Sequence, residues 1–191
     1  MNTPHRLLPC LVMIVTLFPL NIASSANQNA SHASAPPENM VRIGNFFIDI
    51  YEFPNTPGAL PVTNVTWHDA KALCEAEGKR LCTAEEWVQA CRGPQGLRYP
   101  YGQEYDGTKC HAESQVDAPL KIGDTPSTCV SGYGVYDLNG NVWEWVGTSL
   151  QEGVSVRGGA WSSESCAECA LKLWEDKPNT KSDRAGLRCC Q

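Results

Sequence analysis

The cysteines constrain the fold of this chain more than any other feature of its sequence. One of the ten lies within the first 26 residues, and the other nine are Cys74, Cys82, Cys91, Cys110, Cys129, Cys166, Cys169, Cys189 and Cys190. In an oxidising compartment most cysteines of a small domain form disulfides. Because nine is odd, at least one thiol is free, bound to a metal or paired with another chain. We therefore expect a disulfide-stapled domain, in which the cysteine count alone does not fix the pairing.

The first 26 residues have the pattern of an export signal. A short basic stretch at residues 1–6 precedes an apolar stretch at residues 7–20, and small side chains at residues 24–26 offer a cleavage site. This order is typical of a secretory signal peptide. The apolar stretch is shorter than the roughly 20 residues that cross a bilayer. We predict a secreted or periplasmic protein with no integral membrane span in the mature chain.

Composition and charge limit the remaining 165 residues. The signal region contains one basic residue, Arg6, and no acid, so the remainder carries 14 basic and 21 acidic side chains. An acidic chain without a basic stripe does not suit nucleic acid, and we predict no such partner. Residues 27–40 are rich in Ser, Ala, Asn and Pro, which predicts a flexible leader. Residues 41–191 then have the length of one domain.

Two helices are predicted early in the domain. The first begins at Thr66, which forms a capping box with Asp69, and it ends near Gly78. The second begins at Thr83, which forms a capping box with Glu86, and it ends near Gly93. Each helix has a cysteine on its apolar face.

The rest of the domain is rich in turns, with short β segments. Aromatic and β-branched residues predict a strand at residues 46–53. Further strands are expected within residues 135–146, 155–161 and 185–190. Two early helices followed by short, irregular β-sheets indicate an α+β domain.

Seven segments together carry a family resemblance. They are Phe47-Ile-Asp-Ile-Tyr-Glu52, Pro61-Val-Thr-Asn-Val-Thr-Trp67, Gly78-Lys-Arg-Leu-Cys-Thr-Ala-Glu-Glu-Trp87, Tyr99-Pro-Tyr-Gly102, Tyr133-Gly-Val-Tyr-Asp-Leu-Asn-Gly-Asn-Val-Trp-Glu-Trp145, Arg157-Gly-Gly-Ala-Trp161 and Gly186-Leu-Arg-Cys189. In this order they resemble the sulfatase-modifying-factor domain of formylglycine-generating enzymes, from about Val41 to the C-terminus. The resemblance implies a variant of the C-type-lectin-like fold in an exported, calcium-stabilised domain.

The resemblance also implies a calcium site in the fifth segment. Its matching positions are the side chains of Asp137 and Glu144 and the carbonyls of Gly140 and Val142. Carboxylates mixed with backbone carbonyls are the oxygen ligands that calcium prefers. The alternative is that the Asn-Gly pair within residues 138–141 simply forms a hairpin turn.

The copper centre of the family is expected to be lost. The resemblance implies an oxidase that holds copper(I) with two cysteines in a Cys-x4-Cys pattern, and soft thiolates suit that ion. Counting from Arg157, the two cysteine positions are Ser163 and Glu168, and Ala160 replaces the serine after the glycines. Three functional positions therefore differ at once.

Cys166 and Cys169 lie close to these lost positions, and four interpretations of the pair stay open. The first is structural, with one or both cysteines in disulfides to other elements. The second is a redox-active dithiol, and the third is a zinc site shared with Cys189 and Cys190. The fourth is a relocated copper pair, which would make these two cysteines catalytic.

Two statements about the disulfides follow. Adjacent strand residues face opposite sides, so Cys189 and Cys190 should have different partners. The lectin-like resemblance implies that Cys74 meets Cys189 or Cys190, and Cys91 with Cys110 is a further candidate pair.

These observations lead to two functional hypotheses. The leading one is an exported, non-catalytic binding or accessory module whose ligand is a protein, peptide or glycan. The alternative is a copper-dependent oxidase that converts a peptidyl cysteine to formylglycine with Cys166 and Cys169.

Overall fold

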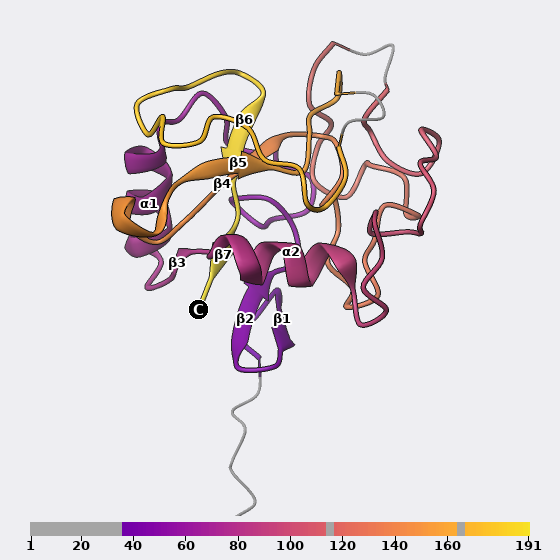
Figure 1. The fold of residues 1–191 in the computed structure, drawn as a ribbon, viewed down its shortest axis with the longest axis horizontal. Helices are drawn as coiled ribbons and strands as arrows, with labels where there is room; N and C mark the ends of the chain where they lie inside the picture. The colour runs from indigo at the N-terminus through magenta and orange to yellow at the C-terminus, as the bar shows by residue number, and fades with distance from the viewer. Residues whose placement is uncertain (1–35, 114–116, 164–166) are drawn as a thin grey trace, which may run out of the picture. The chain divides into compact units, whose positions relative to one another are not determined.

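The computed structural model describes residues 36–113, 117–163 and 167–191. These belong to one compact unit that contains two helices and two small sheets, as Figure 1 shows. The elements in chain order are β1 (Met40–Ile43), β2 (Phe46–Asp49), α1 (Trp67–Ala76), β3 (Arg80–Leu81), α2 (Ala84–Arg92), β4 (Trp143–Val146), the 3-10 helix η1 (Leu150–Glu152), β5 (Ser155–Arg157), β6 (Ala185–Leu187) and β7 (Cys189–Cys190). The predicted α+β class is confirmed. The first strand includes Met40, the last residue of the predicted leader.

Both predicted helix starts are confirmed by their capping boxes. The Thr66 hydroxyl accepts a hydrogen bond from the backbone N–H of Asp69, whose carboxylate accepts one from the Thr66 N–H. Thr83 and Glu86 form the same reciprocal pair at α2. Each cap satisfies N–H groups that the first helical turn leaves unpaired, which stabilises a helix by about 1 kcal/mol.

The end of the chain completes both sheets. In the four-stranded sheet the order is β1-β2-β7-β3, and Cys190 of β7 is paired with both Ile48 and Arg80. In the three-stranded sheet β4 lies between β5 and β6, antiparallel to the first and parallel to the second. The predicted first strand is shorter than expected. It ends at Asp49, and beyond it the Asn55 side chain accepts a hydrogen bond from the backbone N–H of Tyr51.

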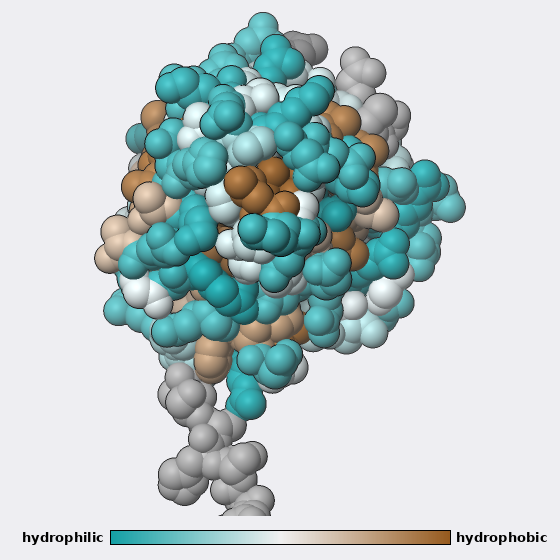
Figure 2. Space-filling view, turned by 60° about the vertical axis from the view of Figure 1, so that its left-hand side comes forward, coloured by the Kyte–Doolittle hydropathy of each residue, from teal (hydrophilic) through white to brown (hydrophobic). Residues whose placement is uncertain are grey.

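The core is built around tryptophans from several elements. Trp145 of β4 and Trp87 of α2 are fully buried, and Trp67 at the start of α1 is nearly so. The indole N–H of Trp145 donates to the carbonyl of Val65, and that of Trp67 to the carbonyl of Gly147. Buried indoles with satisfied N–H groups are typical of a well-packed core. Figure 2 shows the matching surface, where hydrophilic residues cover most of the visible face around small apolar groups.

Four disulfides fasten this fold, and every cysteine in the described ranges takes part in one. The pairs are Cys74–Cys189, Cys82–Cys190, Cys91–Cys169 and Cys110–Cys129. Cys189 and Cys190 have different partners, as predicted, and the expected pairing of Cys74 with the last strand is confirmed. The candidate pair of Cys91 with Cys110 is wrong, because α2 packs against the segment that follows β5 and brings Cys91 to Cys169 instead. Disulfides that close long loops stabilise a domain by restricting its unfolded chain.

Among the described residues, neither helix has the length and apolar character that crossing a bilayer requires.

Candidate functional site

A tight glycine turn shapes the region where the resemblance predicted the two copper-binding positions. The turn follows β5 at Gly158 and Gly159, which both have positive φ angles. A Cβ atom on Gly159 would lie 2.4 Å from the Cβ of Ala167 and 3.1 Å from that of Ser163. Only glycine allows this approach, so the turn is packed directly against the segment that leads to Cys169.

The three altered positions make local structural contacts. The side chain of Ala160 is fully buried, and its backbone N–H donates to the Ser163 hydroxyl at 2.7 Å. The carboxylate of Glu168 forms a surface ion pair with Arg98. A hydroxyl and a carboxylate therefore stand at the two expected cysteine positions, and both are used in holding neighbouring backbone and side chains in place.

Cys169 is part of the scaffold in this structure. Its sulfur is bonded to that of Cys91 on α2, and both residues are fully buried. Cys169 is therefore neither a free thiolate nor half of a disulfide within the Cys-x-x-Cys motif. Cys166 lies outside the described residues. Cys189 and Cys190 are also in disulfides, which excludes them as zinc-binding thiolates here.

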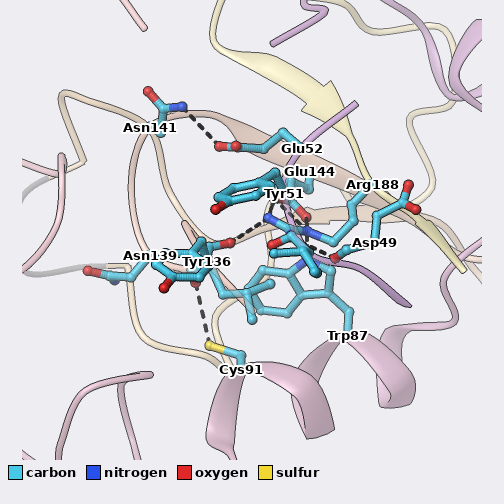
Figure 3. Close-up of polar contacts among 12 residues, drawn as sticks. Asp49, Tyr51, Glu52, Trp87, Cys91, Tyr136, Asn139, Asn141, Glu144 and Arg188 are labelled. Carbon is cyan, nitrogen blue, oxygen red and sulfur yellow. Dashed lines mark hydrogen bonds and ion pairs between the residues drawn. The ribbon is translucent and has the colours of Figure 1, made fainter. Parts of the chain in front are cut away.

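A buried ionic cluster lies in the core of the domain and is centred on Glu144 and Arg188 (Figure 3). Arg188 donates from Nη2 to Oε1 of Glu144 at 2.8 Å and from Nε to Oε2 at 3.0 Å. Trp87 donates its indole N–H to Oε2 at 2.6 Å. Both oxygens of Glu144 thus have hydrogen-bond donors.

Arg188 also binds the backbone of the surrounding chain. Its Nη1 donates to the carbonyls of Asp49 and Ile50 at 3.0 and 2.7 Å, and its Nη2 to that of Tyr136 at 2.7 Å. One guanidinium therefore joins the end of β2, the segment before β4 and β4 itself. Its five N–H donors in a fixed fork suit such a role.

Two further carboxyl groups belong to the cluster. Glu52 accepts a hydrogen bond from the Asn141 amide at 3.0 Å through one oxygen, while its other oxygen is buried without a partner. Burial and the nearby carboxylates raise the pKa of Glu52 well above its ordinary value. Both oxygens of Asp137 are buried without a hydrogen bond of normal geometry, and burial raises the pKa of this carboxyl to about 6 although the nearby Thr125 side chain lowers it. Three carboxyl groups thus surround a single guanidinium.

The predicted calcium ligands fit a metal ion in part. Asp137 has a bare, buried carboxyl group of the kind that a calcium ion would use. Gly140 has a φ angle of 87°, and a Cβ there would lie 2.4 Å from the carbonyl oxygen of His111, so the turn needs glycine. The carboxylate of Glu144 is already engaged by Arg188 and Trp87. Within the described residues, no three His, Cys, Asp or Glu side chains gather as a ready-made metal site.

Sequence reasoning did not assign Glu52 and Arg188 to this cluster. Both lie in segments that carry the family resemblance, Glu52 at the end of the first and Arg188 in the last. Arg188 gave a signal in the sequence, because a charged residue between apolar strand positions either faces solvent or has a buried partner. The partner of Arg188, Glu144, could not be identified without the fold, since the two residues are 44 positions apart.

These features define a disulfide-stapled, C-type-lectin-like domain with a polar cluster in its core. Residues 54–191 match the family model described as the sulfatase-modifying factor enzyme 1-like domain, and the chain belongs to this family.

Curated relatives and solved structures agree with this assignment. The chain is 32% identical over 151 residues to a Bos taurus protein named inactive C-alpha-formylglycine-generating enzyme 2, covering 68% of this chain and 49% of that protein. It is 36% identical over 97 residues to the formylglycine-generating enzyme of Streptomyces coelicolor, covering 44% of this chain and 31% of the enzyme. The chain thus spans half or less of the length of these relatives. Treponema denticola variable protein 1 has the same fold, with a TM-score of 0.63 at 16% identity over 82% of this chain and 92% of that one.

Proposed function

We propose that this protein is an exported binding or accessory module of the family that has no formylglycine-generating activity. The observation that carries the proposal is the disulfide between Cys169 and Cys91, which removes from chemistry the one described cysteine near the lost copper positions. The contacts of Ser163 and Glu168 support it, because both side chains have structural partners. The bovine relative's name, which calls that protein inactive, is consistent with the same conclusion.

The oxidase alternative needs Cys169 as a thiolate. Reduction of a fully buried disulfide would have to precede copper binding, and the Cys91 thiol would then be left in the core. No contact among the described residues favours that sequence of events, so we place this hypothesis second.

Export is proposed from two features. Residues 1–26 have the pattern of a signal peptide, and four disulfides are typical of proteins that fold in an oxidising compartment. We propose a secreted or periplasmic location on these grounds.

Calcium is proposed as a structural ion at the fifth motif. Asp137 would supply its free carboxyl group, with Gly140 and Val142 contributing carbonyls and Glu144 a carboxylate shared with Arg188. When bound, the ion would supply positive charge to a cluster in which acids outnumber bases. The ion would stabilise the fold, and the proposed binding function does not depend on calcium.

A direct activity assay tests the proposed function. The purified, disulfide-intact protein is incubated with copper, oxygen and a peptide that contains Cys-x-Pro-x-Arg, and the peptide is analysed by mass spectrometry. We expect no formylglycine, while an active family member run in parallel converts the peptide. Clear conversion by this protein would overturn the proposal. A second incubation after mild reduction addresses the oxidase alternative, which predicts that activity appears only then.

A further inference from the structure

A small polar cavity of about 210 Å³ lies between the start of α2, β5 and the segment after Leu171. Its charged lining consists of Glu85, Glu152, Arg157, Lys172, Glu175 and Asp176. Arg157 of β5 lines it, and the backbone of this residue is paired with that of Glu144 on β4, just before the glycine turn. Its size is below that of most drug-binding pockets, so it suits a ligand of few atoms.

The cavity is lined by a buried cation, Arg157, one of whose donors has no hydrogen bond. Arg157 is only 8% exposed, and its Nη1 donates to the carbonyls of Ala170 and Leu171 at 3.1 and 3.4 Å. Its Nε is buried without a hydrogen-bond partner. Burial lowers the pKa of Arg157, and the negative charges of Glu85 and Glu175 oppose that effect. An anion that formed hydrogen bonds with this buried guanidinium would add to the charge compensation that these acids already give.

The edge of the cavity has the opposite charge. Glu85, Glu152, Glu175 and Asp176 line it and are all solvent-exposed, and only Glu175 has a lysine partner, Lys172. A simple anion would reach Arg157 past these carboxylates and be repelled by them. A ligand with an ammonium group beside its carboxylate would be attracted by both parts of the site.

A second cavity of about 290 Å³ adjoins the first and shares Ala84, Glu85 and Arg157 with it. It adds the side chains of Val88 and Ala170, which are apolar, and that of Arg92. The two cavities share Arg157 and between them offer basic groups, a group of acids and an apolar wall. This combination suits an aliphatic amino acid. Its carboxylate needs a cation, its ammonium needs acids, and its side chain needs an apolar wall.

We propose that the Arg157 cavity binds a free α-amino acid with an aliphatic side chain. The carboxylate pairs with Arg157, the ammonium faces the acids at the edge, and the side chain lies along Val88 and Ala170. This inference rests on the proposed function, because it names a ligand class for the binding module.

Calorimetric titration of the whole disulfide-bonded protein with L-leucine tests the inference. We expect saturable binding, with at least about tenfold weaker binding of 4-methylpentanoate, which lacks the amine, and of 3-methylbutylamine, which lacks the carboxylate. Absence of L-leucine binding, or equal binding of 4-methylpentanoate, overturns the proposal. Absence of binding would mean that the cavity does not take an aliphatic amino acid. Equal binding of 4-methylpentanoate would mean that the cavity recognises only the carboxylate.

Variants identify the site. Arg157→Gln should weaken L-leucine binding by about tenfold or more, since a charged hydrogen-bond pair is lost. Because Arg157 also holds two carbonyls, the exposed variants Glu85→Gln and Asp176→Asn provide an independent test. They should each weaken binding by a few fold and leave the melting temperature unchanged. Glu104→Gln, an exposed acid outside both cavities, is the matched control. L-leucine binding that none of the three site variants weakens, or that Glu104→Gln weakens as much as they do, would overturn the proposal. Formylglycine formation in the peptide assay would instead contradict the non-catalytic function, whatever the titration shows.

Discussion

The guanidinium of Arg188 binds both carboxylate oxygens of Glu144 inside the core, where each side chain is at most 1% exposed. The pair joins β4 to the residue between β6 and β7, so it connects the last strands of the chain to the central strand of the smaller sheet. Desolvation of both groups offsets much of their attraction, so the net contribution of the intact pair to the free energy of unfolding is small. Removal of one partner has a different consequence, because it leaves the other charge buried alone.

Arg188→Met should therefore destabilise the protein strongly. We expect a loss of about 3–5 kcal/mol in the free energy of unfolding, since Glu144 would keep only the Trp87 donor and three carbonyls would lose theirs. Urea unfolding measures the change. The double variant Arg188→Met/Glu144→Gln is the control, because it removes both charges. It should be more stable than the single variant, and equal stability of the two would contradict this account of the pair.

Asp137 should give the protein a pH dependence of its own in the absence of metal. Its pKa is raised from the ordinary 3.8 to about 6, chiefly by burial. Between these values the unfolded chain has released the proton that the folded protein still holds, so stability falls as the pH rises. Below pH 3.8 both states are protonated and the penalty vanishes; above pH 6 it is complete, at about 3 kcal/mol.

The difference between the parent protein and Asp137→Asn measures this effect together with its coupling to Glu52, whose pKa the Asp137 charge also raises. Urea unfolding in chelator at several pH values from 4 to 7 should show the parent losing stability relative to the variant as the pH rises. A difference that stays constant across this window would mean that the Asp137 carboxyl titrates in the folded protein as it does in the unfolded chain.

Calcium should reverse that penalty if it binds as proposed. Positive charge at Asp137 favours the ionised carboxyl, and any ion that binds only the folded state stabilises it, by about 2.7 kcal/mol at a hundred times its dissociation constant. Chelation should lower the melting temperature of the parent protein, and Asp137→Ala should abolish the chelator effect. Identical melting curves with and without chelator would mean that residues 137–144 form a turn and nothing more.

The sequence was sufficient for features that depend on neighbouring residues. Thr66 with Asp69 and Thr83 with Glu86 are three positions apart, so their capping boxes could be predicted from local chemistry. The family resemblance added the approach of Cys74 to the last strand. The Asn-Gly pair indicated the turn at Gly140, where backbone conformation and close packing together require glycine.

Features that depend on packing between distant segments were beyond the sequence. Cys91 and Cys169 are 78 positions apart, and nothing near either one indicates that α2 lies against the segment after β5. In the sequence Arg157 was only the residue from which the two cysteine positions were counted. The fold shows that it is buried beside a cavity. In each case the partner is selected by tertiary packing, which periodicity and motif spacing do not encode.

The disulfide map gives a prediction that also bears on the oxidase alternative. Peptide mapping without reduction should yield four linked pairs, and Cys166 should appear in none of them because the eight described cysteines are bonded to one another. A Cys91 peptide linked to Cys169 leaves no copper pair. Recovery of Cys169 as a free thiol would instead contradict the structure and favour the alternative function.

Gly140→Ala tests whether the turn at the predicted calcium site depends on packing as well as on backbone conformation. Both Gly140 and Gly44 have positive φ angles, 87° and 59°, but a Cβ at Gly44 would meet nothing within 4 Å. Gly44→Ala should therefore cost only the conformational penalty of about 1–2 kcal/mol. Gly140→Ala should cost clearly more in urea unfolding, because the new methyl group would lie 2.4 Å from the carbonyl oxygen of His111 and force two buried segments apart. Equal destabilisation by the two variants would show that the segments separate without cost.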